Sequence, residues 1–339
     1  MFASVPDLLR LAVLPVLGWA AWRDIEIRRV PSRTWYPLVA LGIVLLAWDA
    51  LGHLSVAAPE DLLFFVRVTV SVFLVAPIAY LFWRLGGFGG ADAKALIVLA
   101  VLFPTFPQYL FPGFSLPLTR TTVGVFSLTV LTNTVFVGAL YPVAVTLRNA
   151  LSGHVSPVMF LGKPVPSAKV VEAYGSLMQT PEGTTRSGLD LDALRMYLQW
   201  RGCSLAELRS DPDRFRDPDS LPADPNPPGD GSIPVEGAAD ASGPTETDTP
   251  DEDAATDGAG TGAPPDADDP WGAEAFLDDI EGSAYGTTPE TLREGLDVLV
   301  DEEVVWVSPG MPFIVPMFAG LLVSLVYGDL FVAVVGAVV

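Results

Sequence analysis

Residues 62–83 read LLFFVRVTVSVFLVAPIAYLFW, and this stretch decides the fold of the chain. It is apolar almost throughout, with Arg67 as its one charged residue. An α-helix of this length rises about 33 Å, which is enough to cross the roughly 30 Å hydrocarbon layer of a membrane. Within lipid every backbone polar group needs a partner in the protein, so only helices and closed barrels can span it. The stretch is too long for a barrel strand and therefore predicts a membrane-spanning α-helix.

Five other apolar runs have a similar composition: Leu8–Trp22, Tyr36–Leu51, Ala93–Leu110, Thr122–Leu147 and Pro312–Val339. Asp7 and Arg10 make the first of them short. That run lacks the basic start and the small-residue cleavage site of a signal peptide, so we expect it to be retained. The six runs predict an all-α integral membrane protein with six transmembrane helices, and the lipid bilayer is its first expected partner.

The net charge of −21 is distributed unevenly along the 339 residues. Residues 148–310 hold 10 Lys and Arg against 32 Asp and Glu, whereas the rest of the chain holds 9 against 8. This pattern excludes a simple soluble globule, and it excludes the basic surface of a nucleic-acid binder. The single cysteine, Cys203, excludes disulfides within the chain and a four-thiolate zinc site, and we expect neither a metal nor another cofactor.

The acidic segment predicts a small α/β module that is interrupted by a disordered insert. Residues 187–209 have helical periodicity with Ser187 and Ser204 as N-caps, helices are expected again after Trp271, and EVVWV predicts a strand. Residues 211–270 contain almost no large apolar side chain and are predicted to be disordered. The predicted divisions of the chain are 1–147, 148–210, 211–270, 271–311 and 312–339. We interpret the negative charge as solvation in a salty cytoplasm, with a docking surface for a basic partner as the alternative.

Orientation follows from the arginines of the short loops. Four lie after the first predicted helix: Arg23, Arg28, Arg29 and Arg33. The loop after the second helix has no Lys or Arg. Because basic loops stay in the cytoplasm, we expect both termini outside the plasma membrane and residues 148–310 inside the cell.

Two carboxylates stand out in this near-neutral body. Asp92 ends the sequence GGFGGAD, in which four glycines directly precede a helix, and Asp24 follows the first helix in DIEIRRVP. Each also has a simple structural explanation, as a helix cap or an ordinary interface charge. The predicted topology, however, places both at one membrane face. Two carboxyl groups at one site share a proton, so one can act as a base on water while the other polarises a peptide carbonyl.

These residues resemble the motifs of the archaeal type IV prepilin and preflagellin peptidases, membrane aspartyl proteases of the GxGD type. The matching positions are Asp24, Arg28, Val30 and Pro31 in the first motif, Gly89, Gly90, Ala91 and Asp92 in the second, Lys94 after it, and Pro312 to Pro316 before the last helix. Glu26 departs from the family, in which a basic residue is common at this point. Ala91 replaces a glycine of the bacterial relatives, and one cysteine cannot build their four-cysteine loop, so we expect no methylation activity.

The resemblance implies that Asp24 and Asp92 are catalytic, and that the loop-shaping or substrate-binding residues are Gly89, Gly90, Ala91, Lys94 and Arg28. It implies type IV prepilin and preflagellin precursors as partners, cleaved after a short basic leader at the cytoplasmic border of the membrane. It says nothing of the oligomeric state. Two alternatives remain: an ion-coupling transporter that uses Asp92 in a glycine-broken helix, and a non-catalytic scaffold that acts through its acidic arm.

Overall fold

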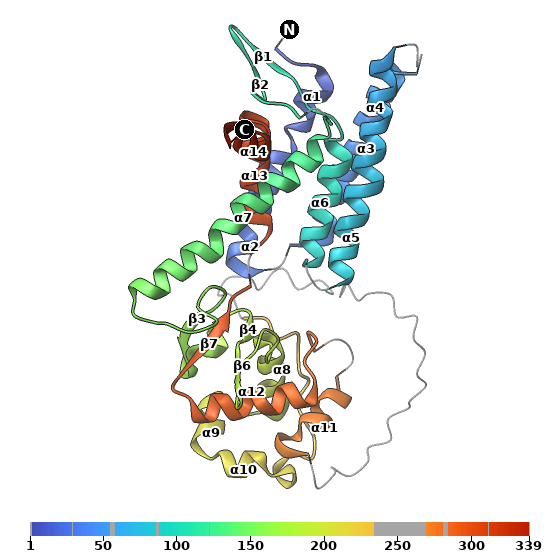
Figure 1. Cartoon of the computed structure of the whole chain (residues 1–339). Helices are drawn as coiled ribbons and strands as arrows, with labels where there is room; N and C mark the ends of the chain where they lie inside the picture. The colour runs from blue at the N-terminus through green and yellow to red at the C-terminus, as the bar shows by residue number, and fades with distance from the viewer. Residues whose placement is uncertain are drawn as a thin grey trace. The chain divides into compact units, whose positions relative to one another are not determined.

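The computed structural model describes residues 2–28, 30–54, 58–85, 88–121, 123–233, 269–280, 284–310 and 312–338. The chain forms two compact units (Figure 1). Unit 1 consists of residues 1–141 and 311–339, and unit 2 consists of residues 142–310.

Four helical segments of the described chain are long and apolar enough to cross a membrane. They are Val5–Ile27, made of α1 (Val5–Arg10) and α2 (Val13–Ile27); Ser32–Gly52, made of a 3-10 turn (Ser32–Thr34) and α3 (Tyr36–Gly52); Pro59–Arg84, made of α4 (Pro59–Val70), a π-helical turn (Ser71–Val75) and α5 (Ala76–Arg84); and α7 (Phe126–Leu151). The outer faces of these helices expose many large apolar side chains, as a lipid-facing surface requires.

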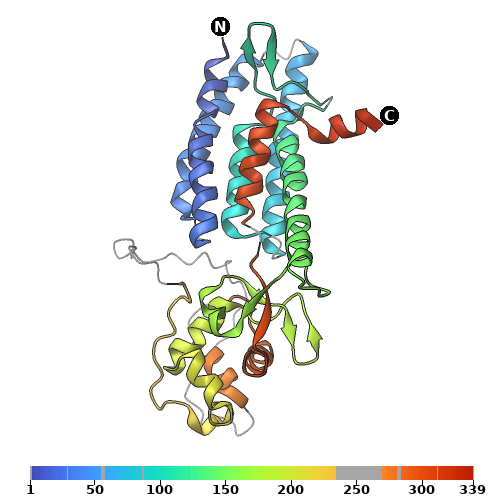
Figure 2. The same ribbon diagram turned by 90° about the vertical axis from the view of Figure 1, so that its left-hand side faces the viewer.

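The two other predicted spans contain shorter helices than expected. Helix α6 (Gly90–Leu102) and helix α13 (Ile314–Val326) have 13 residues each, and both rise only about 20 Å. After α6 the chain enters a hairpin of β1 (Tyr109–Phe111) and β2 (Phe114–Leu116). After α13 it breaks at Gly328, where φ is +102°, before α14 (Leu330–Val338) turns away from the bundle (Figure 2). The prediction of six spans is therefore confirmed for four helices only.

The charges at the start of the first span do not shorten it. Arg10 donates to Asp7 at 2.8 Å and to the carbonyl of Leu102 at 2.6 Å, and it also pairs with Asp49. Arg10 and Asp7 are both buried. Because the charges neutralise one another inside the protein, the segment Val5–Ile27 runs for 23 residues, and the prediction of a short first helix is wrong.

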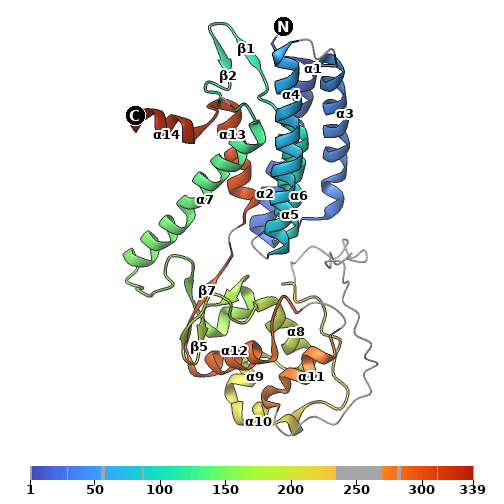
Figure 3. The same ribbon diagram turned by 45° about the vertical axis from the view of Figure 1, so that its right-hand side comes forward.

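Helix α6 lies at the centre of unit 1. It packs against α3, α5 and α13, and α13 in turn packs against α2 and hydrogen-bonds with α7 (Figures 2 and 3). Gly42 permits the close approach of α3 to α6, because a Cβ there would lie 3.0 Å from Val101. The buried side chains of α6 are Ala93, Ala95, Leu96, Val98, Leu99, Ala100 and Leu102. Helix α6 is therefore held in place from several sides.

Unit 2 is an α/β fold with its own core. An antiparallel sheet has the order β3 (Lys163–Pro166), β7 (Val304–Ser308), β4 (Ser176–Leu177), and β5 (Gln179–Thr180) pairs with β6 (Gly183–Thr184). The helices are α8 (Leu191–Arg201), α9 (Leu205–Ser210), α10 (Pro212–Arg216), α11 (Ala273–Asp278) and α12 (Pro289–Asp301). Tyr197, Trp200 and Phe276 form an aromatic cluster at the centre of the core. The predicted strand and the helices after Trp271 are confirmed.

Two boundaries in unit 2 differ from the prediction. Ser204 caps α9 as expected, but α8 is capped by Asp190, whose side chain accepts from the N–H of Asp192 at 2.8 Å, and not by Ser187. Disorder is predicted from residue 211, yet the chain makes defined contacts through residue 233. Arg216 pairs with Asp297 of α12 at 2.7 Å, Arg201 donates to the carbonyl of Phe215 at 2.7 Å, and Gln199 donates to the carbonyl of Pro227 at 3.0 Å. Residues 234–268 of the predicted insert lie outside the described residues.

Candidate active site

Asp24 lies inside helix α2, in its last turn, and does not follow the helix as predicted. The residue is only 8% exposed, and its Oδ2 atom has no hydrogen-bond partner among the described residues. The helix ends three residues later, at Ile27, because its C-cap Arg28 adopts a left-handed conformation with φ of +58°. A carboxyl group that is buried without a full set of hydrogen bonds is costly, and such a cost is typical of functional sites in membrane proteins.

Asp92 lies in the first turn of α6, as the sequence predicts. Its Oδ2 atom accepts from the N–H of Gly89, the N-cap residue, at 3.1 Å. A Cβ at Gly89 would lie 3.1 Å from the same oxygen, so glycine leaves room for the carboxyl group to turn back. A Cβ at Gly90 would meet only Trp83 at 3.6 Å, and Ala91 packs partly buried against the core. The positive end of the helix dipole also stabilises a carboxylate at this position.

The structure brings the two carboxyl groups together. The charges of Asp24 and Asp92 lie close enough to interact with each other, and each also interacts with Arg28. The backbone N–H of Ile314, at the start of α13, lies near enough to both carboxyl groups to interact with them. Three segments that are distant in sequence therefore meet at one point of unit 1.

Lys94 joins the two motif regions by a different contact. Its Nζ atom donates to Ser32 Oγ at 2.8 Å, so α6 is tied to the turn that follows Arg28. This contact gives Lys94 a defined partner within the protein. Neither Ser32 nor Ile314 is predicted as a site residue from the sequence, although Ile314 lies within the Pro312 to Pro316 segment that resembles the family.

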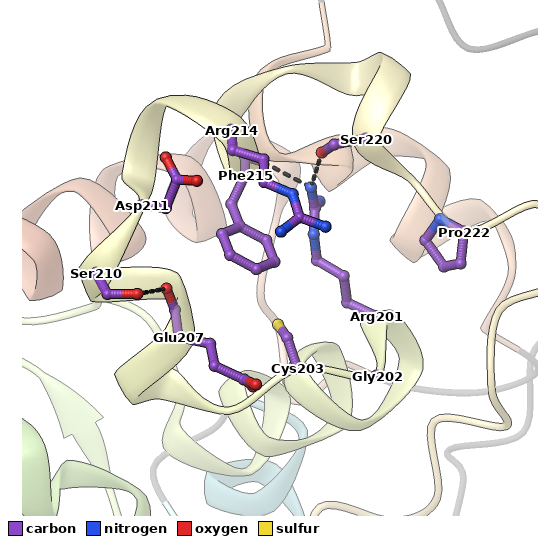
Figure 4. Close-up of a pocket in the computed structure, with 10 residues that line it drawn as sticks. All are labelled: Arg201, Gly202, Cys203, Glu207, Ser210, Asp211, Arg214, Phe215, Ser220 and Pro222. Carbon is purple, nitrogen blue, oxygen red and sulfur yellow. Dashed lines mark hydrogen bonds between the residues drawn. The ribbon is translucent and has the colours of Figure 1, made fainter.

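Unit 2 contains a separate pocket of about 510 Å³ (Figure 4). Arg201 is buried beside it and donates to the carbonyl of Phe215 at 2.7 Å and to Ser220 Oγ at 2.6 Å. Burial raises the pKa of the Cys203 thiol in this pocket to about 11, so the thiol stays protonated at neutral pH. Since the thiolate is the reactive form of cysteine, Cys203 is a poor nucleophile here.

Among the residues that the structure describes, no group of three or more His, Cys, Asp or Glu side chains could hold a metal ion. His53 ends α3 and stacks on Phe64 with ring centroids 4.2 Å apart, and its Nδ1 atom contacts the carbonyl of Asp49. His154 lies in the loop after α7. The pair of carboxyl groups in unit 1 is therefore the candidate active site.

Comparison with known proteins gives two matches to family models. Residues 11–143, which include Asp24 and Asp92, match the type IV leader peptidase family, and residues 279–330, which include Ile314, match the archaeal peptidase A24 C-terminus, type II. The chain is also similar to the prepilin peptidase EppA of Methanothermobacter thermautotrophicus, with 28% identity over 146 residues. That alignment covers 42% of this chain and 35% of the relative. The two family matches together contain all three segments that meet at the carboxyl pair, and the chain belongs to the type IV leader peptidase family, as one of its archaeal members.

Proposed function

We propose that this membrane protein is an aspartic endopeptidase in which Asp24 and Asp92 are the catalytic pair. The observation that carries the proposal is the meeting of these two carboxyl groups at the N–H of Ile314, with Asp24 Oδ2 buried and without a partner among the described residues. The family match over residues 11–143 supports a peptidase that processes leader sequences.

The chemistry follows from two carboxyl groups that share one proton. The ionised group takes a proton from a water molecule, and the protonated group donates to the oxygen of the scissile peptide bond. The resulting hydroxide attacks the carbonyl carbon and gives a tetrahedral intermediate. In its collapse the group that took the water proton gives it to the departing nitrogen, the other group takes back the proton of the carbonyl-derived hydroxyl, and the C–N bond breaks. The pair again shares one proton. Arg28 lies near enough to both carboxyl groups to limit the negative charge of the site.

The substrates are precursors of type IV pilins and archaellins, with a short basic leader ahead of a hydrophobic helix. The leader lies extended along Gly89, Gly90 and Ala91, where backbone can approach backbone as in strand addition. Arg28 and Lys94 shape the walls of this loop region. Cleavage takes place at the cytoplasmic border of the membrane, with both termini outside the cell, residues 148–310 in the cytoplasm, and α6 and α13 completing six membrane-inserted segments.

A cleavage assay with purified protein in liposomes and a precursor with a basic leader tests the proposal. Wild-type protein should remove the leader, whereas Asp24→Asn and Asp92→Asn should each lower the rate at least about 10³-fold. Glu26→Gln is the matched control, because Glu26 is an exposed carboxylate on the same helix and should cleave at the wild-type rate. An Asp24→Asn protein that processes precursor normally would contradict the proposal. Cation flux through the liposomes without cleavage would favour the ion-coupling alternative instead.

A further inference from the structure

The start of helix α13 is a third element of the carboxyl site. Phe313 is the N-cap of this helix and Ile314 is its first residue. The N–H of Ile314 lies near enough to the carboxyl groups of both Asp24 and Asp92 to interact with them. This donor belongs to the main chain, so it cannot be identified from the type of residue at position 314.

The first turn of α13 leaves this one N–H for the site. The first N–H groups of any α-helix lack partners within the helix. In α13 the N–H of Val315 donates to the carbonyl of Pro312 at 3.0 Å, and the N–H of Met317 donates to the carbonyl of Phe313 at 3.1 Å. Pro316 has no N–H to donate. Among the described residues, the N–H of Ile314 has no acceptor within its own helix, and it lies near the carboxyl pair.

Asp24 supplies the second observation. The residue is 8% exposed, and its Oδ2 atom is buried and has no hydrogen-bond partner among the described residues. The facing N–H of Ile314 therefore does not complete a short bond to this atom in the absence of substrate. Hydrogen bonds of catalytic groups are often long in free enzymes and tighten when substrate binds.

Aromatic packing holds the donor in place. The ring of Phe313 lies 4.7 Å from that of Phe88, which is in the glycine-rich loop, and Phe88 lies 5.1 Å from Phe82 on α5. Further along α13, Phe318 lies so close to Gly18 of α2 that a Cβ there would sit 3.2 Å from the ring. The start of α13 is thus fixed to the loop before Asp92 and to the helix that carries Asp24.

We propose that the N–H of Ile314 is the positioning donor of the carboxyl pair, and that Phe313, packed on Phe88, keeps this donor aimed at it. This inference rests on the peptidase function proposed above. The donor fixes one oxygen of the ionised carboxylate, which leaves another lone pair free to receive the proton of the attacking water. Ile314 is a positioning residue, since it acts through the carboxyl groups and not on the substrate.

An amide-to-ester replacement tests the donor directly. Incorporating the α-hydroxy acid of isoleucine at position 314 of the full chain removes the N–H and keeps the side chain. The same replacement at Leu322, in the middle of α13, is the matched control, because it removes an ordinary backbone donor from the same helix. We expect kcat to fall roughly 10- to 100-fold at position 314 with KM unchanged, which is the range for one hydrogen bond to a charged group. The ester at Leu322 should leave kcat within about twofold of wild type.

A side-chain pair tests the positioning without unnatural chemistry. Phe313→Ala should lower kcat with KM unchanged, and Phe313→Tyr should restore it because the ring is kept. An ester at 314 or a Phe313→Ala protein with wild-type kcat would overturn the inference, as would an equal loss for the Leu322 ester. The proposed function has its own test. It is wrong if wild-type protein does not cleave the precursor, or if the Asp24→Asn protein cleaves it at the wild-type rate.

Discussion

The two ends of the first membrane span hold buried carboxyl groups in opposite situations. At one end Asp7 accepts from Arg10 at 2.8 Å and from the N–H of Gln108 at 3.3 Å, and Arg10 also pairs with Asp49. At the other end Asp24 lies near a second carboxyl group, and its Oδ2 atom has no partner among the described residues. The comparison teaches that burial alone does not mark a reactive acid. A buried carboxylate that is paired with a cation and with N–H donors stabilises the fold. A buried carboxyl group that lacks a hydrogen-bond partner and lies near a second carboxyl group can take part in proton transfer.

The largest expected effect is the loss of cleavage when the open pair is altered. Asp24→Asn and Asp92→Asn should each lower the cleavage rate at least about 10³-fold, and the double variant should be no slower than either single one. The reason is that the two groups work as a unit, so removing the second costs nothing more. Cleavage rates of the four proteins measure this. Losses that multiply in the double variant would mean that the groups act independently.

Substitutions in the cluster of Asp7, Arg10 and Asp49 should lower the stability of the protein and leave its cleavage chemistry unchanged. Arg10→Met leaves the buried carboxylate of Asp7 and the half-buried carboxylate of Asp49 without their cation, and we expect the free energy of unfolding to fall by about 3–5 kcal/mol. Thermal unfolding in detergent measures this. Arg67→Met is the control, since among the described residues Arg67 donates to the carbonyl of Val123 alone, at 3.1 Å, in an exposed hydrogen bond. Its loss should cost no more than about 1.5 kcal/mol. An Arg10→Met protein that is stable but inactive would place this cluster in the chemistry.

Unit 2 contains another buried carboxylate with a cationic partner, Asp269 beside Arg293. Burial raises the pKa of Asp269, but hydrogen bonds from Arg293 and from the N–H groups of Glu274 and Ala275 outweigh it and hold the pKa below its ordinary value. A lowered folded-state pKa means that this stabilisation is present above the unfolded value, about 3.9, and is lost as the pH falls through the folded value. Arg293→Met should therefore cost about 1.5–3 kcal/mol at pH 7 and progressively less below about pH 4. Unfolding of the full chain followed at several pH values measures this, and a cost that does not change with pH would contradict it.

The smallest effect concerns the acidic arm. Deleting residues 234–268 should leave the cleavage rate within about twofold of wild type, because we interpret this charge as solvation. The deletion keeps residues 211–233, which are ordered and contribute Arg216 to its pair with Asp297. A folded deletion protein that no longer cleaves precursor would assign the arm to substrate binding.

The sequence predicted features that depend on neighbouring residues. The cap of α9 by Ser204, the strand at β7 and the place of Asp92 at the start of α6 are all local in origin. The failures depend on distant contacts. The sequence does not show that Arg10 pairs with Asp49, so Asp7 and Arg10 predict a short first span. Residues after 211 are held by distant partners that include Asp297 and Gln199. The donor at Ile314 was missed because a backbone N–H has no sequence signature.

The most direct test of the central claim compares Asp24→Asn with Asp7→Asn, the same substitution at the two ends of one span. Precursor cleavage and thermal unfolding are measured on both proteins. We expect the Asp24→Asn protein to fold with wild-type stability and not to cleave precursor. We expect the Asp7→Asn protein to be less stable but to cleave precursor while it is folded. An Asp24→Asn protein that cleaves precursor at the wild-type rate would contradict it.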